Sequence, residues 1–111
     1  MSIQVFGTKK CRDTQKAIRY FKERRIKFHY VDLAEKPFSP GELNSIGRSI
    51  PMEELIDREG KQFRKRQLEY MKFDPYEEIL DDPLLAKTPI VRSQGKAAAG
   101  FDPDFWKSLI D

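Results

Sequence analysis

Residues 6–17 read FGTKKCRDTQKA, and they lead from an apolar strand through a short polar loop into a helix. The strand covers residues 3–6 and ends at Gly7. From 13 to 25 the apolar residues recur at helical spacing, with charged residues around the other side. The next run, 27–33, is rich in aromatic and branched residues and predicts a second strand. A connection this short predicts a right-handed crossover between two parallel strands.

The middle of the chain, roughly 39–86, is predicted to be a helical segment inserted after the second strand. The tetrapeptide Ser-Pro-Gly-Glu at 39–42 starts its first helix. Its serine can cap the helix, its proline suits the first helical position, and its glutamate can reach back to the cap. Further helices or helical turns are expected after Pro51, around 68–71 and over 74–80.

The end of the chain predicts a hairpin followed by a helix. Residues 88–92 form a strand entered through a proline, 93–95 form a turn, and 96–100 form a second strand. An Asp-Pro pair at 102–103 then caps a last helix. The whole order predicts an α/β fold with a mixed four-stranded sheet flanked by helices. We expect residues 1–111 to form one domain, with the helical insertion between strands 2 and 3.

The composition argues against several classes of function. The 111 residues are 39% hydrophobic and 35% charged, which is the balance of a soluble globular protein rather than a disordered tail. No apolar run approaches the roughly 20 residues that span a bilayer, and residues 1–10 lack the order of a signal peptide. We therefore expect a cytoplasmic protein that does not contact membranes. The net charge is only +3 with interspersed signs, which argues against direct nucleic-acid binding.

Cys11 is the only cysteine, so the chain can form no internal disulfide and no cysteine-rich zinc site. It lies where the first helix is expected to begin, and a helix N-terminus stabilises a thiolate. Lys9, Lys10 and Arg12 add positive potential beside it. Because the thiolate is the nucleophile, this position favours a reactive cysteine over an inert one. A redox reaction at this sulfur must then be completed by a thiol from another molecule.

Two further residues bear on this cysteine. Thr14 stands three residues after it, where a Cys-x-x-Cys motif has its second thiol. Its hydroxyl can donate to the thiolate or bond the backbone of the first helical turn, and the sequence favours neither role. Pro89 begins a strand, and alone it is consistent with an edge strand or with a cis peptide bond after Thr88.

Other polar residues are assigned structural or surface roles. His29, the only histidine, lies in mid-strand between two aromatic residues. No second histidine or carboxylate cluster has the spacing of metal ligands, so no metal site is expected. The Asp-Asp pair at 81–82 is expected to end a helix, and the basic run at 64–66 is expected to be a solvated helix face.

Four stretches carry a resemblance: residues 6–17, 55–60 (LIDREG), 88–92 (TPIVR) and 100–106 (GFDPDFW). In this order and spacing they resemble the arsenate reductase-related (ArsC/Spx) branch of the thioredoxin-like superfamily. The resemblance covers essentially the whole chain, including the helical insertion that distinguishes this branch from plain glutaredoxins. It implies a thioredoxin-like fold, a nucleophile at Cys11 and a cis-proline at Pro89 facing it.

The chain departs from the arsenate reductases of this family where they hold the oxyanion with three arginines. Arg58 matches the arginine of the helical insertion, but Thr88 and Gly100-Phe101 stand where the other two are expected. Losing two costs several kcal/mol, at about 1.5–3 kcal/mol per charged hydrogen bond. Arsenate is therefore disfavoured as a substrate, and Arg12 and Arg92 are the residues left to compensate.

The leading hypothesis is a monothiol thiol–disulfide oxidoreductase with Cys11 as the catalytic nucleophile. The residues expected to contact its substrate are Lys10, Arg12, Thr14, Arg58, Thr88, Pro89 and Arg92. The Thr-Pro pair resembles that of glutaredoxins and thioredoxins, in which the backbone before the cis-proline pairs with glutathione or a protein cysteine. No bound cofactor is expected. Glutathione, as co-substrate, or a glutaredoxin- or thioredoxin-like protein would resolve the mixed disulfide.

The alternative hypothesis is a non-catalytic regulatory adaptor of the Spx kind that binds RNA polymerase. Many such regulators carry a Cys-x-x-Cys switch, which Thr14 removes here, although a polymerase-binding surface does not depend on that switch. A third hypothesis is a degenerate relative with neither role.

Overall fold

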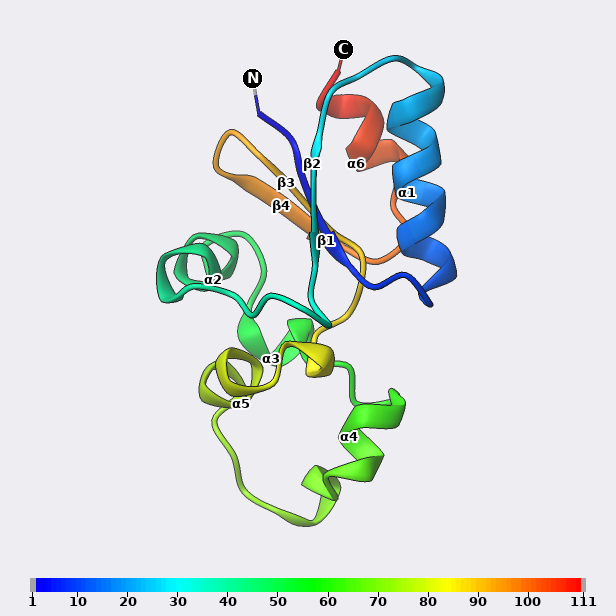
Figure 1. The fold of residues 1–111 in the computed structure, drawn as a ribbon. Helices are drawn as coiled ribbons and strands as arrows, with labels where there is room; N and C mark the ends of the chain where they lie inside the picture. The colour runs from blue at the N-terminus through cyan, green and yellow to red at the C-terminus, as the bar shows by residue number, and fades with distance from the viewer. Residues whose placement is uncertain (1, 111) are drawn as a thin grey trace.

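The computed structural model describes residues 2–110, which are drawn as a ribbon in Figure 1. Four strands form one sheet in the order β2-β1-β3-β4. They are β1 (Gln4–Gly7), β2 (His29–Asp32), β3 (Ile90–Ser93) and β4 (Lys96–Ala99). β1 pairs in parallel with β2 and antiparallel with β3, and β3 and β4 form an antiparallel hairpin. The mixed four-stranded sheet and its parallel opening confirm the sequence prediction.

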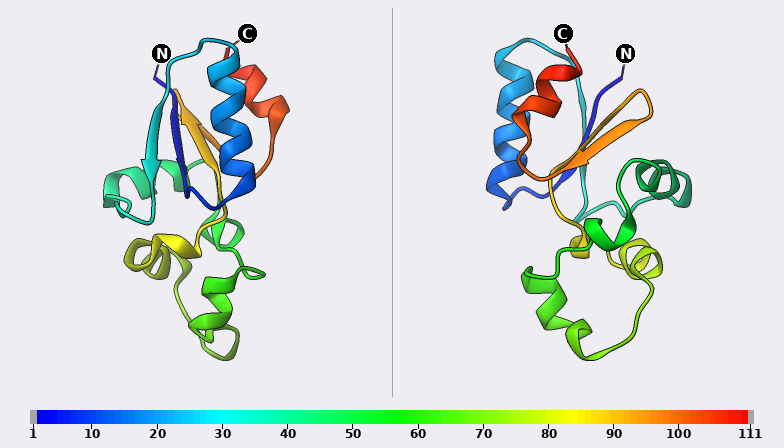
Figure 2. Two further views of the ribbon diagram at one scale, coloured as in Figure 1. Left: turned by 45° about the vertical axis from the view of Figure 1, so that its right-hand side comes forward. Right: turned by 180° about the vertical axis from the view of Figure 1, so that it is seen from behind.

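Two helices cover one face of this sheet, as both views in Figure 2 show. They are α1 (Arg12–Glu23) and α6 (Pro103–Ser108). Phe21 of α1 and Trp106 of α6 are buried against Val5 and Val91, which point to this face from the two central strands. This packing fixes the start of α1 next to the end of β1, where the cysteine lies.

The segment between β2 and β3 is helical and packs on the other face of the sheet. Its elements are α2 (Pro40–Gly47), α3 (Met52–Leu55), α4 (Lys61–Lys65), the 3₁₀ helix η1 (Leu68–Tyr70), α5 (Pro75–Asp81) and the 3₁₀ helix η2 (Pro83–Leu85). Phe6, Val31 and Ile90 of the sheet share one buried cluster with Leu43 of α2 and Ile79 of α5. Figure 1 shows this helical segment, coloured green to yellow, extending beyond the end of the sheet.

The helix starts confirm the capping signals in the sequence. The Ser39 hydroxyl accepts a hydrogen bond from the Glu42 N–H at 3.1 Å, and the Glu42 carboxylate accepts one from the Ser39 N–H at 2.8 Å. This is a complete capping box. Asp74 caps α5 and Asp102 caps α6, each followed by a proline at the first helical position.

The two ends of the helical segment are joined at the base of β3. Ile56 and Ala86 form an isolated antiparallel bridge. The Lys87 N–H donates to the Leu55 carbonyl at 2.8 Å on one side of it. The chain entering β3 is therefore held just before Thr88, and β3 begins at Ile90 rather than at the predicted residue 88.

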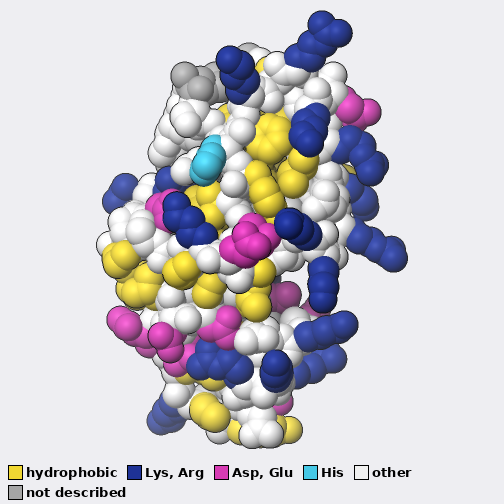
Figure 3. All heavy atoms as spheres, in the orientation of Figure 1, with side chains coloured by type: hydrophobic (Ala, Val, Ile, Leu, Met, Phe, Trp, Pro, Cys, Tyr) yellow, Lys and Arg dark blue, Asp and Glu magenta, His cyan; other side chains and the backbone are white. Residues whose placement is uncertain are grey.

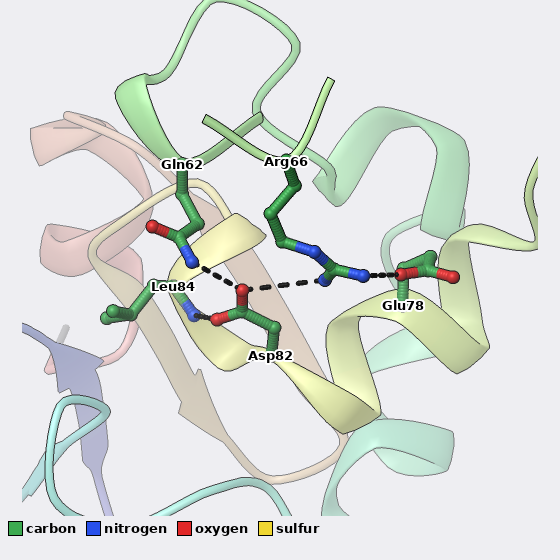
Figure 4. Close-up of polar contacts among 5 residues, drawn as sticks. All are labelled: Gln62, Arg66, Glu78, Asp82 and Leu84. Atoms are coloured by element: carbon green, nitrogen blue, oxygen red, sulfur yellow. Dashed lines mark hydrogen bonds and ion pairs between the residues drawn. The ribbon is translucent and has the colours of Figure 1, made fainter. Parts of the chain in front are cut away.

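One surface prediction is wrong. The basic run 64–66 is not wholly a solvated face, because Arg66 is half-buried and forms ion pairs with Glu78 and Asp82. Gln62 donates to the same Asp82 carboxylate at 2.6 Å, and Figure 4 shows the four side chains joined in one network. The partners of Arg66 lie 12 and 16 residues further on, so the local run of charge gave no sign of them.

Between residues 2 and 110, no helix combines the length and the apolar character that crossing a bilayer requires.

Candidate active site

Cys11 is the N-cap residue of α1 and is partly exposed. Its own N–H donates to the Thr8 carbonyl at 3.2 Å, which closes the loop after β1, and its carbonyl accepts from the Gln15 N–H at 3.1 Å. The side chain thus lies at the positive end of a 12-residue helix, beside N–H groups that have no partner within the helix. This position favours the thiolate form.

Thr88 lies directly against the sulfur. Its hydroxyl donates to Cys11 Sγ at 3.1 Å, and its carbonyl oxygen is 3.7 Å from the same sulfur, within reach of the S–H. The Thr88–Pro89 peptide bond is cis, as the resemblance implies. Cys11 can therefore donate to the Thr88 carbonyl as a thiol and accept from the Thr88 hydroxyl as a thiolate.

The surroundings of the sulfur lower the pKa of the Cys11 thiol from its ordinary value of 9.0. Partial burial raises the pKa, because it disfavours the charged form. The hydroxyls of Thr14 and Thr88 and the N–H groups of Thr14 and Asp13 lower it, because each stabilises the thiolate. The hydrogen-bond donors together outweigh the burial, and the thiolate gains population at neutral pH.

The Thr14 side chain is completely buried beneath this site. Its hydroxyl has no hydrogen-bond partner among the described residues, and the thiolate of Cys11, whose pKa it lowers, is the charge that it can stabilise. Gly7 makes this placement possible, because a Cβ at Gly7 would lie only 2.3 Å from Thr14 Oγ1. Of the two roles that the sequence leaves open for Thr14, the hydrogen bond to the backbone of the first turn is not formed, and the lowered pKa of Cys11 supports the other role. The need for a glycine at position 7 has no local signal in the sequence beyond the end of a strand.

Lys10 and Arg12 flank the cysteine but are exposed. Neither is among the groups that lower the pKa of Cys11, contrary to the expectation from their place in the sequence. Water screens exposed charges, whereas the hydroxyls and N–H groups contact the sulfur directly. Both cations stay beside the site, free of ion pairs within the described part of the chain.

Arg58 lies in the turn between α3 and α4 and makes no hydrogen bond to the sulfur. Its guanidinium lies over two aromatic rings, 5.7 Å from the centroid of Phe63 and 5.3 Å from that of Phe73. It makes no hydrogen bond or ion pair within residues 2–110, so its donors are available to an anion.

Arg92 lies elsewhere. On β3 it pairs with Gln4, at the start of β1, whereas Cys11 follows the end of that strand. Its guanidinium donates to the Gln4 side chain and to the Glu42 carbonyl and lies over the ring of Phe6. The structure thus brings together Cys11, Thr14, Thr88 and Pro89 but does not bring Arg92 to them.

The described residues contain no group of three or more His, Cys, Asp or Glu side chains that could hold a metal ion.

These features define a class of protein: a thioredoxin-like α/β fold with one cysteine at the start of its first helix and a cis-proline beside it. A model of the ArsC family matches residues 6–109, and the chain belongs to that family.

Solved structures agree on the fold. A protein named YFFB is 21% identical with a TM-score of 0.85, and the match covers 98% of this chain and 99% of that one. An arsenate reductase from Vibrio cholerae is 16% identical with a TM-score of 0.82 and 98% of each chain covered. The glutaredoxin-like NrdH-redoxin from Escherichia coli is 14% identical, with a TM-score of 0.51 over 98% of this chain and 95% of that one. A search of curated proteins finds no significant match.

Membership of the ArsC family and the thioredoxin-like fold support a thiol-based redox function.

Proposed function

We propose that this protein is a monothiol thiol–disulfide oxidoreductase in which Cys11 is the nucleophile. The observation that carries the proposal is the sulfur at the N-terminus of α1, with the Thr88 hydroxyl 3.1 Å away. The lowered pKa of Cys11 supports it, because the thiolate is the attacking form.

In the proposed reaction the Cys11 thiolate attacks one sulfur of a disulfide. A bond forms between Sγ and that sulfur, the bond between the two substrate sulfurs breaks, and the second sulfur leaves as a thiolate that takes a proton from water. Since Cys11 is the only cysteine, a second molecule must resolve the mixed disulfide. The thiolate of glutathione, or of a glutaredoxin- or thioredoxin-like protein, attacks it and releases Cys11 as a thiolate.

The backbone at Thr88 supports a substrate that contains a peptide group. The Thr88 N–H makes no hydrogen bond within residues 2–110, and its carbonyl faces the sulfur at 3.7 Å. An extended peptide next to its own sulfur can pair with these two groups, as a strand pairs with a sheet edge. Pro89 is buried and shapes this side of the site.

Arsenate is not the proposed substrate. The residue against the sulfur is a neutral threonine, and Gly100-Phe101 supplies no guanidinium after β4. Lys10, Arg12 and Arg58 are the cations left for an anionic substrate group, such as a carboxylate of glutathione. Exposed cations suit a weak contact with a carboxylate better than tight binding of a tetrahedral oxyanion.

Mass spectrometry after incubation with oxidised glutathione tests the proposal. We expect one glutathione adduct on Cys11, which reduced glutathione then removes, and no adduct on the Cys11→Ser variant. Thiol transfer should be catalytic when both forms of glutathione are present with a disulfide substrate. A wild-type protein that stays unmodified by disulfides at neutral pH would refute the proposed function.

The adaptor hypothesis rests on family resemblance alone, and no contact within the described residues favours it over the redox function.

A further inference from the structure

The loop before Cys11 borders a groove that the proposed reaction does not use. The groove has a volume of about 430 Å³. It is lined by Lys9 and Lys10 of the loop, by Asp32, Ala34 and Glu35 at and after the end of β2, and by Leu84 of η2. Thr8 also lines it, and the Thr8 carbonyl accepts the N–H of Cys11 at 3.2 Å. The groove therefore borders the loop that leads into Cys11, although Cys11 itself does not line it.

Leu84 provides an apolar surface in this groove. Leu84 is 43% exposed. Its backbone is nonetheless fixed, because its N–H donates to Asp82 Oδ1 at 3.2 Å. Gln62 and Arg66 hold the other oxygen of the same carboxylate, as Figure 4 shows. An exposed apolar side chain on a backbone that is held in place offers a surface on which a second apolar residue can be buried.

A second hollow continues from this groove along the edge of the sheet. It also has a volume of about 430 Å³, shares Lys9, Asp32 and Glu35 with the first, and runs past His29 and Tyr30 of β2. β2 is the outermost strand on this side, and within residues 2–110 it pairs only with β1. Its outer edge is therefore open to an added extended chain. The two hollows together suit a polypeptide better than a tripeptide.

The charges around the groove are free to bind a partner. Lys9, Lys10, Asp32 and Glu35 form no ion pair among the described residues. Figure 3 shows hydrophobic side chains in a band across the middle of this face, with basic and acidic side chains around them. An occupant that complements the groove has an apolar residue for Leu84 and an acidic residue that faces Lys9 and Lys10 and points away from Asp32 and Glu35.

We infer that this groove binds an extended segment of a protein disulfide, with a bulky apolar residue against Leu84 and an acidic residue against Lys9 and Lys10. The inference rests on the proposed function, since it names the class of disulfide that Cys11 attacks. Glutathione has no apolar side chain to place on Leu84, so it reacts at the same sulfur without using this surface.

Two synthetic heptapeptides provide the probes. Each carries one cysteine joined by a disulfide to nitrothiobenzoate, with a glutamate beside it. One has leucine two residues from the cysteine and the other has serine there. When Cys11 attacks the peptide sulfur, the peptide becomes bound to Cys11 and the coloured nitrothiobenzoate leaves, so the release gives the rate of a single turnover. Oxidised glutathione is the third probe, followed by mass spectrometry.

We expect the wild-type protein to react with the leucine peptide roughly tenfold faster than with the serine peptide, because only the leucine peptide buries apolar surface against Leu84. The Leu84→Ser variant should lose this preference but keep its rate with oxidised glutathione. The matched control is Tyr70→Ser, at a residue that is 82% exposed but lies outside the groove, and this variant should keep the preference.

The charge at Lys9 gives a second comparison. Lys9→Glu should slow the reaction with the glutamate-containing peptides, whereas Lys22→Glu, an equal change of charge on the exposed side of α1, should not. A Leu84→Ser variant that retains the preference, or that loses rate equally with oxidised glutathione, overturns the inference. Absence of reaction with all three probes in the wild-type protein refutes the proposed function itself.

Discussion

Thr88 contributes a hydroxyl rather than a charge to the sulfur of Cys11. A donor at 3.1 Å stabilises the thiolate but offers no bidentate contact to an oxyanion. Under the proposed function, this one residue both activates the nucleophile and disfavours arsenate as a substrate.

Replacing Thr88 by valine keeps the shape of the side chain and removes the donor. We expect the pKa of Cys11 to rise, because the hydrogen bond favours the charged form. Alkylation by iodoacetamide at pH 7 should slow by roughly tenfold, since a hydrogen bond to a charged group contributes about 1.5–3 kcal/mol. Thr88→Ser keeps a hydroxyl and should react nearly as fast as the wild-type protein. Equal rates for the valine and serine variants would contradict this role.

Gly7 is needed for the close approach of Thr14. A Cβ at this position would overlap the buried Thr14 side chain at 2.3–2.9 Å. We expect Gly7→Ala to lower the free energy of unfolding by about 1–3 kcal/mol, as overpacking does in cores, and urea denaturation measures the loss. Gly41→Ala is the control, because a Cβ there meets nothing within 4 Å. Similar stability for the two variants would show that Thr14 can move without cost.

At the scale of elements, the ion-pair network of Arg66 ties α4 to α5 and η2. The side chains of Arg66, Glu78 and Asp82 are 31%, 25% and 19% exposed, so removing the guanidinium leaves two poorly solvated carboxylates. We expect Arg66→Met to cost about 1–3 kcal/mol in the free energy of unfolding. Arg64→Met, on an exposed neighbour, should cost much less. Equal costs for both in urea denaturation would show that the network contributes little.

The elements also show what a sequence can predict. The caps at Ser39, Asp74 and Asp102 were predictable, because a cap depends on residues within three positions of it. The partners of Arg66 and Arg92 were not, because they lie 12 to 88 residues away and only the folded chain brings them together.

The candidate site also has one part that the local sequence predicts and one part that only the folded chain brings together. The place of Cys11 at the start of a helix follows from local pattern, and the cis bond at Pro89 follows from the resemblance. The contact of the Thr88 hydroxyl with the sulfur spans 77 residues and required the structure. The same holds for the groove at Leu84, which is built from three separate segments.

At the scale of the whole molecule, the sheet joins two buried clusters. Val5 faces the cluster under α1 and α6, and its neighbour Phe6 faces the cluster of the helical insertion. Because adjacent residues of one strand belong to both clusters, we expect the insertion and the sheet to unfold together as one domain.

Urea unfolding followed by two signals checks this prediction. Trp106, the only tryptophan, is buried between α6 and the sheet, so its fluorescence reports on the packing of α1 and α6 against the sheet. Far-ultraviolet circular dichroism reports mainly on the helices, most of which belong to the insertion. The two transitions should have the same midpoint and slope. An earlier loss of helical signal would show that the insertion unfolds on its own.

The redox function depends most directly on the ionisation of one sulfur, and the rate of iodoacetamide alkylation of Cys11 as a function of pH measures it. Hydrogen-bond donors around the sulfur lower its pKa in the folded protein, so the alkylation rate should increase with pH through a midpoint below 9.0. Below that midpoint the rate should be low, because the thiol is protonated. The same protein unfolded in urea should show the midpoint of an ordinary thiol. A folded protein with a midpoint at or above 9.0 would contradict the assignment of Cys11 as an activated nucleophile.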